Sequence, residues 1–208
     1  MAPRTILGIP QSHGRTVMDK GRLEAFSDGV IAIIITIMVL EMAVPHSGDL
    51  AALRPVIPAF VSYVLSFMFI GIYWNNHHHM LHAAQEVNGR ILWSNLHLLF
   101  WLSLIPFATA WMGENHFAQL PVALYGTVLM MAGIAYYILA HSLIRHHGRD
   151  STLALALGKD FKGKLSVLVY AAAIPLSFFN RWIALGAYVA VAVMWLIPDR
   201  RIERTLTA

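Results

Sequence analysis

Residues 22–42, "RLEAFSDGVIAIIITIMVLEM", join a polar beginning to an apolar run. The hydrocarbon core of a bilayer is about 30 Å thick, so a spanning helix needs about 20 mostly apolar residues. This stretch is long and apolar enough to be such a helix. It nevertheless carries hydrogen-bonding side chains that lipid cannot satisfy, which are Arg22, Glu24, Ser27, Asp28 and, deep in the apolar run, Thr36.

The composition of the whole chain agrees with that stretch. Of 208 residues, 58% are hydrophobic and 12% are charged, whereas about a quarter of the residues of a soluble protein are charged. We therefore predict an all-α integral membrane protein. The absence of cysteine excludes disulfides, thiolate metal sites and a cysteine nucleophile. The excess of Lys and Arg is assigned to cytoplasmic loops rather than to nucleic acid, which is not an expected partner.

Six segments are apolar enough to be transmembrane helices. Pro106 is expected to kink the third, and the short fifth and sixth, joined by "FNRW", form either a hairpin or two thin spans. We divide the chain into an N-terminal tail (1–18), a six-helix domain (19–199) and a C-terminal tail (200–208). The six segments are residues 20–44, 53–79, 91–112, 121–144, 165–179 and 182–197.

The basic residues predict the orientation of these helices. With six spans, thirteen basic residues fall on the side of both termini and only Arg54 and Arg181 on the other. Because cytoplasmic loops are enriched in Lys and Arg, we expect a multi-pass protein of the cell membrane with both termini in the cytoplasm. The thirteen are Arg4, Arg15, Lys20, Arg22, Arg90, Arg145, Arg149, Lys159, Lys162, Lys164, Arg200, Arg201 and Arg204.

Two features of the first helix admit more than one interpretation. Ile33, Thr36, Ile37 and Leu40 have the spacing of one helical stripe, but such a stripe can face lipid or protein, since both are apolar. Asp28 lies about two turns inside the helix, where a carboxylate either interacts with the helix start and the headgroups or serves a function.

The second helix ends in "YWNNHHHMLH". His78 and His82 are four residues apart, a spacing that can hold a divalent metal, although no site for a metal is expected here. We instead expect Trp74 and His77 to lie at the depth of Asp28 and to hydrogen-bond its carboxylate. Those bonds would fix the rotation of the first helix about its axis.

The residues alone leave three classes of function open. One is a passive cation channel, and the second is a proton- or metal-coupled transporter that uses Asp28, Glu41 and the histidines from His77 to His82. The third is a haem-binding oxidoreductase that uses His97 and His141. The sequence contains no Gly-rich phosphate loop, catalytic-triad spacing or paired carboxylates, so no enzymatic activity is predicted.

The segment "RLEAFSDG" resembles the signature of the transmembrane protein 175 family of potassium channels, the lysosomal potassium channel family. That signature is Arg, three residues and then Phe-Ser-Asp. "SLIPFATAW" is similar to the third helix of the family, and the resemblance covers the first half of the chain, whereas the second half matches only in helix count. The matching residues are Arg22, Phe26, Ser27 and Asp28 of the first helix and Trp74, His77 and His78 of the second.

The resemblance implies a pore lined by the first helix and, for a chain with one six-helix unit, a homotetramer in the lipid bilayer. It places the constriction at Ile33, Ile37 and Leu40 and the conserved pore threonine at Thr36. It also implies a hydrogen-bonded brace that orients the pore helix, formed by Arg22, Phe26, Ser27, Asp28, Trp74, His77 and His78.

No carbonyl filter such as "TVGYG" is present, so selectivity must arise differently. The implied pore has a narrow apolar neck, which an ion crosses by shedding water and which can close by dewetting. Potassium loses its hydration shell more easily than sodium. We therefore expect a modest preference for potassium, with no cofactor besides the permeant ions.

Overall fold

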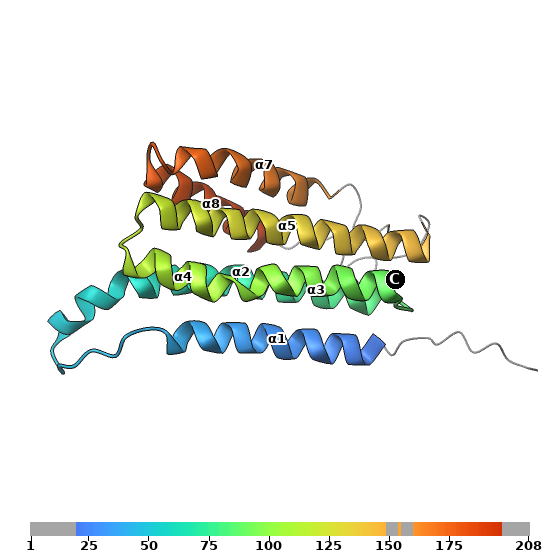
Figure 1. Cartoon of the computed structure of the whole chain (residues 1–208), viewed down its shortest axis with the longest axis horizontal. Helices are drawn as coiled ribbons and strands as arrows, with labels where there is room; N and C mark the ends of the chain where they lie inside the picture. The colour runs from blue at the N-terminus through green and yellow to red at the C-terminus, as the bar shows by residue number, and fades with distance from the viewer. Residues whose placement is uncertain (1–19, 149–153, 155–159, 197–208) are drawn as a thin grey trace, which may run out of the picture.

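The computed structural model of the chain describes residues 20–148, 154 and 160–196. Within these residues the regular structure is helical and forms an elongated bundle (Figure 1). Its elements are α1 (Lys20–Leu40), the 3-10 helix η1 (Leu50–Val56), α2 (Ile57–Ala83), α3 (Gly89–Ser103), α4 (Ile105–Glu114), α5 (Gln119–His147), α7 (Phe161–Leu176) and α8 (Arg181–Leu196).

Each predicted segment coincides with helix, and four stretches are long and apolar enough to cross a membrane: Lys20–Leu40, Leu50–Ala83, Gly89–Glu114 and Gln119–His147. The helices α7 and α8 have 16 residues each, so the count of six crossings stays a prediction. The predicted tails and Ile197 lie outside the described residues.

Several helix boundaries differ from the prediction by a few residues, and the first and third helices differ most clearly. The first helix ends at Leu40 rather than at residue 44. The third predicted helix is divided at Leu104 into α3 and α4. Pro106 lies in the first turn of α4, where its missing N–H leaves no helical hydrogen bond unmade. The helix is therefore interrupted next to the predicted position of the kink.

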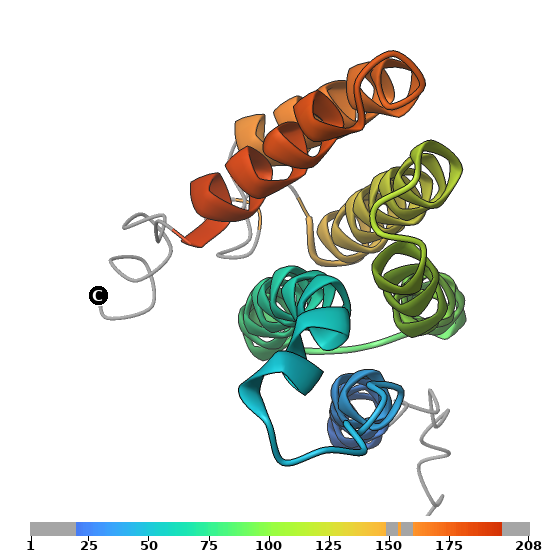
Figure 2. The same ribbon diagram turned by 90° about the vertical axis from the view of Figure 1, so that its left-hand side faces the viewer.

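The helices alternate in direction, and α1 lies at one edge of the bundle (Figures 1 and 2). It packs against α2, α3 and α4, whereas α7 and α8 pack against α5 and α2 on the other side. The beginnings of α1, α3 and α7 and the ends of α2 and α5 share one end of the bundle. One side of α1 therefore has no neighbour from its own chain among the described helices.

A buried tyrosine joins α8 to α5. The Tyr188 hydroxyl donates to the backbone oxygen of Val122 at 3.2 Å, and its ring lies 5.9 Å from that of Tyr125. The Tyr188 side chain passes over Gly126, where a Cβ atom would overlap its hydroxyl oxygen. Glycine at 126 therefore permits the close approach of the two helices.

We predict that Gly126→Ala lowers the free energy of unfolding by about 1–3 kcal/mol, because the added methyl group displaces Tyr188. Unfolding by SDS in mixed micelles measures the change. Gly186→Ala in α8 is the control, since a Cβ there meets nothing within 4 Å and alanine favours the helix. Equal stability of Gly126→Ala and wild type would contradict the account.

Candidate functional site

The helix α1 has two distinct faces. One face is buried against the bundle and consists of Leu23, Ser27, Ile31, Ile34 and Met38. The other carries the predicted pore stripe, of which Ile33 is 57%, Ile37 39% and Leu40 80% exposed. Lipid supplies no hydrophobic force that would turn this stripe in either direction, so contacts on the buried face must set the rotation of the helix.

Thr36 lies on the exposed stripe and bonds to its own helix. Its hydroxyl lies 2.9 Å from the carbonyl oxygen of Ile33 and 3.2 Å from that of Ala32. The hydroxyl proton is donated backwards along the helix, so the oxygen lone pairs are available on the exposed side. A cation beside the stripe would meet this oxygen.

A chain of buried side chains connects α1 to α2 and α3. Ser27 donates to the carbonyl oxygen of Leu23 at 2.8 Å, and the Asn95 amide of α3 donates to the Ser27 hydroxyl at 2.9 Å. The carbonyl oxygen of Asn95 lies 2.7 Å from His77 Nε2 of α2. Since the Asn95 oxygen can only accept, His77 donates through Nε2. Ser27, Asn95 and His77 are almost fully buried.

A second connection between α1 and α2 is exposed. The Trp74 indole N–H donates to Asp28 Oδ1 at 3.0 Å. Its ring stacks on His78 at 5.9 Å between centroids, and His78 stacks on His82 at 6.1 Å. Lys20 Nζ donates to the backbone oxygen of His82 at 3.2 Å. The first turns of α1 are thus bound to the last turns of α2.

The structure arranges the predicted brace residues differently from the expectation in two respects. Asp28 is bonded to Trp74, but His77 is bonded to Asn95 and not to Asp28. Arg22 and Phe26 are exposed and take no part in these hydrogen bonds and ring stacks of the described residues.

Asn95 is a member of the site that the sequence interpretation did not assign. An amide inside an apolar helix must find partners, because an unsatisfied polar group in a membrane interior is costly. That reasoning singles out Asn95 in "LWSNLHLLF", but it does not say which side chains it meets. The partners become visible only when three helices are packed together.

The other half of α1 contacts a cluster of hydroxyl groups. Thr109 of α4 lies 2.6 Å from Ser66 of α2, and Ser66 lies 2.9 Å from the Tyr125 hydroxyl of α5. The Thr109 hydroxyl also lies 3.9 Å from the Met38 sulfur. The buried face of α1 thus makes a polar contact near each of its ends, at Ser27 and at Met38. The contact at Met38 leads to α2, α4 and α5, which are also hydrogen-bonded to one another.

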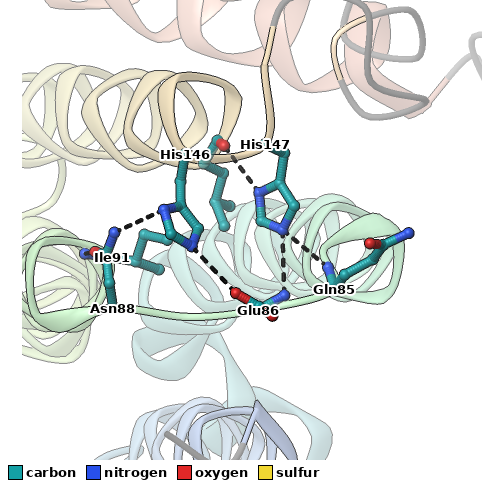
Figure 3. A network of polar contacts seen from close by, with 7 residues as sticks. Gln85, Glu86, Asn88, Ile91, His146 and His147 are labelled. Carbon is teal, nitrogen blue, oxygen red and sulfur yellow. Dashed lines mark hydrogen bonds and ion pairs between the residues drawn. The ribbon is translucent and has the colours of Figure 1, made fainter. Parts of the chain in front are cut away.

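Histidines at the end of α5 hold the connection between α2 and α3 (Figure 3). His147 Nε2 accepts from the backbone N–H groups of Gln85 at 3.0 Å and Glu86 at 3.2 Å. His146 lies 3.0 Å from the Asn88 amide and 3.9 Å from the Glu86 carboxylate. This connection fixes α2, which carries His77, relative to α3, which carries Asn95.

The residues of the two rival functions have other partners. Among the described residues, no three His, Cys, Asp or Glu side chains are grouped to hold a metal ion. His97 accepts from the Trp101 indole at 3.0 Å, and His141 Nδ1 lies 3.0 Å from the Tyr137 carbonyl oxygen. Each of these two imidazoles therefore has a partner within its own helix.

The fold and the site define a helical membrane protein whose first helix is fixed by buried hydrogen bonds and has a free apolar face. Residues 22–106 match the family described as the endosomal/lysosomal potassium channel TMEM175. The chain is 57% identical over 189 residues to a potassium channel of Chryseobacterium sp. (strain P1-3), covering 91% of this chain and 98% of that one.

More distant relatives show the same relationship. The crystal structure of a lysosomal potassium-selective channel TMEM175 homolog from Chamaesiphon minutus superposes with a TM-score of 0.74 at 28% identity, covering 86% of this chain and 96% of that chain. The human endosomal/lysosomal proton channel TMEM175 is 28% identical over 173 residues, 74% of this chain and 33% of that one. The chain belongs to the TMEM175 family of ion channels, so the resemblance inferred from the sequence is confirmed, and the family is not one of enzymes.

We predict that Asn95→Leu lowers the free energy of unfolding by about 1–3 kcal/mol, because it leaves the buried His77 N–H without an acceptor. SDS unfolding in mixed micelles measures the loss. Asn115→Leu is the matched control, since the Asn115 side chain is exposed and bonds only locally to Trp111. Trp74→Phe should cost less than Asn95→Leu because its hydrogen bond is exposed, and the reverse order would contradict this assignment.

Proposed function

We propose that the chain is a potassium channel whose pore is lined by the α1 helices of four copies, with a modest preference for potassium over sodium. The observation that carries this proposal is the division of α1 into two faces. The buried face is held by Ser27, Asn95 and His77, while Ile33, Ile37 and Leu40 are left exposed on the other. The apolar stripe is exposed, and α1 lies at the edge of the bundle (Figure 2). Four copies would meet on this face around an axis.

The constriction would be formed by Ile33, Ile37 and Leu40 of each copy. The carbonyl groups of a regular helix are committed to its own backbone, so they cannot replace the hydration water of an ion. A neck of isoleucine and leucine side chains requires partial dehydration, which favours potassium over sodium and can close the pore by dewetting. A ring of Thr36 hydroxyl oxygens would compensate part of the lost water.

The names of the relatives support an ion-conducting role and identify the ions to test. The bacterial relative is named a potassium channel and the human relative a proton channel. The Chamaesiphon minutus homolog is described as potassium-selective. Potassium is the permeant ion in this proposal, and protons are the natural comparison ion besides sodium.

The proposed setting is the cytoplasmic membrane of a bacterium. Six of the thirteen basic residues are described, and they belong to helix ends that share one end of the bundle (Figure 1): Lys20, Arg22, Arg90, Arg145, Lys162 and Lys164. The bias of thirteen basic residues to two supports a cytoplasmic position for that end. Both termini would then be cytoplasmic.

We predict that liposomes holding the purified protein release potassium faster than sodium, and that Ile37→Ala raises the rate for both ions and reduces the ratio. The smaller side chain widens the neck and so lowers the dehydration required. Ile183→Ala on α8 is the control, because Ile183 is also exposed but lies outside the proposed pore. Identical flux and selectivity in Ile37→Ala and Ile183→Ala would contradict the location of the pore.

The competing function, a proton- or metal-coupled transporter, depends on the charge of Asp28. Asp28→Asn keeps an oxygen that can accept from the Trp74 indole but removes the carboxylate. For a channel we expect potassium flux within about twofold of wild type. The exposed hydrogen bond from Trp74 can form to a neutral amide oxygen as well as to a carboxylate. A complete loss of flux in folded Asp28→Asn protein, together with proton-coupled uptake in wild type, would favour the transporter.

A further inference from the structure

An aromatic pocket lies on the side of the bundle away from α1, between α2, α5, α7 and α8. Five of its eleven described lining residues carry aromatic rings, and one carries a carboxylate. None of its residues belongs to the proposed pore stripe or to the brace. Its principal lining residues are Phe69, Tyr73, Tyr136, Tyr170, Trp195 and Asp160.

Two hydroxyl groups of the pocket wall have no hydrogen-bond partner among the residues that the structure describes. Tyr170 is only 3% exposed, and its ring packs edge-on against Phe69 with centroids 6.4 Å apart. Neither its hydroxyl nor that of Tyr73 forms a hydrogen bond with another residue in the described part of the chain. No fully enclosed side-chain nitrogen or oxygen of the described residues lacks a partner, so these two hydroxyl oxygens reach the accessible space of the pocket. The pocket therefore offers two hydrogen-bonding groups to whatever occupies it.

Asp160 supplies the charge of the pocket. Its Oδ1 accepts from the Gly163 N–H at 3.1 Å and caps α7. Its backbone is left-handed, with φ of 40°, and a Cβ atom on residue 163 would lie 2.5 Å from a carboxylate oxygen. Glycine at 163 thus allows this carboxylate to lie across the helix start, and Oδ2 has no hydrogen-bond partner among the described residues.

The carboxylate is partly desolvated. Burial raises the pKa of Asp160 above its usual value, and the Gly163 N–H, His141 and Lys164 oppose that rise. A further cation at the pocket would stabilise the ionised form. An anionic ligand would be repelled by the same carboxylate, and a neutral apolar one would leave its charge and the tyrosine hydroxyls unsatisfied.

The aromatic walls also attract cations. The ammonium group of Lys162 already lies 5.9 Å from the centroid of the Trp195 ring, within the range of a cation–π interaction. Phe69, Tyr136 and Tyr170 present further apolar surface to the carbon skeleton of a ligand. A carboxylate beside several aromatic rings is the combination that recognises organic ammonium groups.

We propose that this pocket binds a primary ammonium group joined to an apolar moiety, with the nitrogen at Asp160 and the tyrosine hydroxyls and the carbons between the rings. Two sources share this chemistry, a small arylalkyl amine and the ethanolamine headgroup of a membrane lipid. The proposal does not rest on the proposed pore, because no described lining residue belongs to the stripe or to the brace and because the test measures binding rather than ion flux.

The first arm uses phenethylammonium as the probe and 2-phenylethanol as its neutral match in size. Isothermal titration of the purified full-length protein, in detergent and an amine-free potassium buffer, gives the affinity. We expect phenethylammonium to bind, 2-phenylethanol to bind at least tenfold more weakly, and Asp160→Asn to weaken phenethylammonium at least tenfold. Asparagine caps helices as well as aspartate does, so this variant keeps the fold.

Glu114→Gln is the matched control, since Glu114 is an exposed carboxylate at the end of α4. It should bind phenethylammonium like wild type, while Tyr170→Phe should bind it several-fold more weakly.

The second arm places the protein in vesicles of equal phosphatidylethanolamine and phosphatidylcholine and counts retained lipids by native mass spectrometry. Retention of phosphatidylethanolamine by wild type, lost in Asp160→Asn, would identify the lipid headgroup as the ligand.

Binding in either arm that depends on Asp160 supports the proposal, and the arm that responds identifies the source of the ammonium group. Two results would overturn it. One is that phenethylammonium binds no more tightly than 2-phenylethanol and that phosphatidylethanolamine is retained no more than phosphatidylcholine. The other is that Asp160→Asn binds them as tightly as wild type does.

Discussion

The rotation of α1 about its own axis is the constraint on which the account of this protein depends. In water, an amphipathic helix is oriented by burying its apolar side, but in lipid both sides are equally apolar. Hydrogen bonds must then supply the orientation. In this chain Ser27, Asn95 and His77 supply it, because a buried group left without a partner costs about 1–3 kcal/mol.

Because an α-helix is regular, fixing the direction of one side chain near its start also fixes the directions of side chains further along it. Successive residues are about 100° apart around the axis, so fixing Ser27 inward also fixes which residues face inward two and three turns later. Ile31, Ile34 and Met38 share the buried side, and Met38 meets the hydroxyl of Thr109 there. Ile33, Thr36 and Ile37 are consequently presented outward, where four copies of the chain could surround ions.

The proposed pore stripe and the aromatic pocket lie on different sides of the bundle. The edge with α1 carries the stripe that we assign to conduction, and the opposite side, with α7 and α8, carries the aromatic pocket at Asp160. Between them, α2 contributes Trp74 and His77 to the brace and Phe69 and Tyr73 to the pocket. The helix α2 therefore contributes side chains to both places.

The helices could be predicted well from the sequence, because a long apolar run or a proline determines the backbone conformation of its own segment. The sequence identified the helix that begins at Lys20, the interruption near Pro106 and the proximity of Asp28 to Trp74. It did not identify Asn95 as the partner of Ser27 and His77, because those residues meet only when three helices pack. The pocket was also missed, since its rings come from four helices and no spacing along the chain connects them.

The most direct test of the central claim uses the fact that the chain contains no cysteine. A single thiol would be introduced as Thr36→Cys on the exposed stripe, or as Ile183→Cys on the exposed face of α8. Silver ions, which are small and monovalent and react with thiols, would be added to liposomes during potassium flux. The account predicts that silver stops the flux through Thr36→Cys and leaves wild type and Ile183→Cys unaffected. Unchanged flux through Thr36→Cys protein, with the thiol shown to have reacted, would contradict a pore lined by α1.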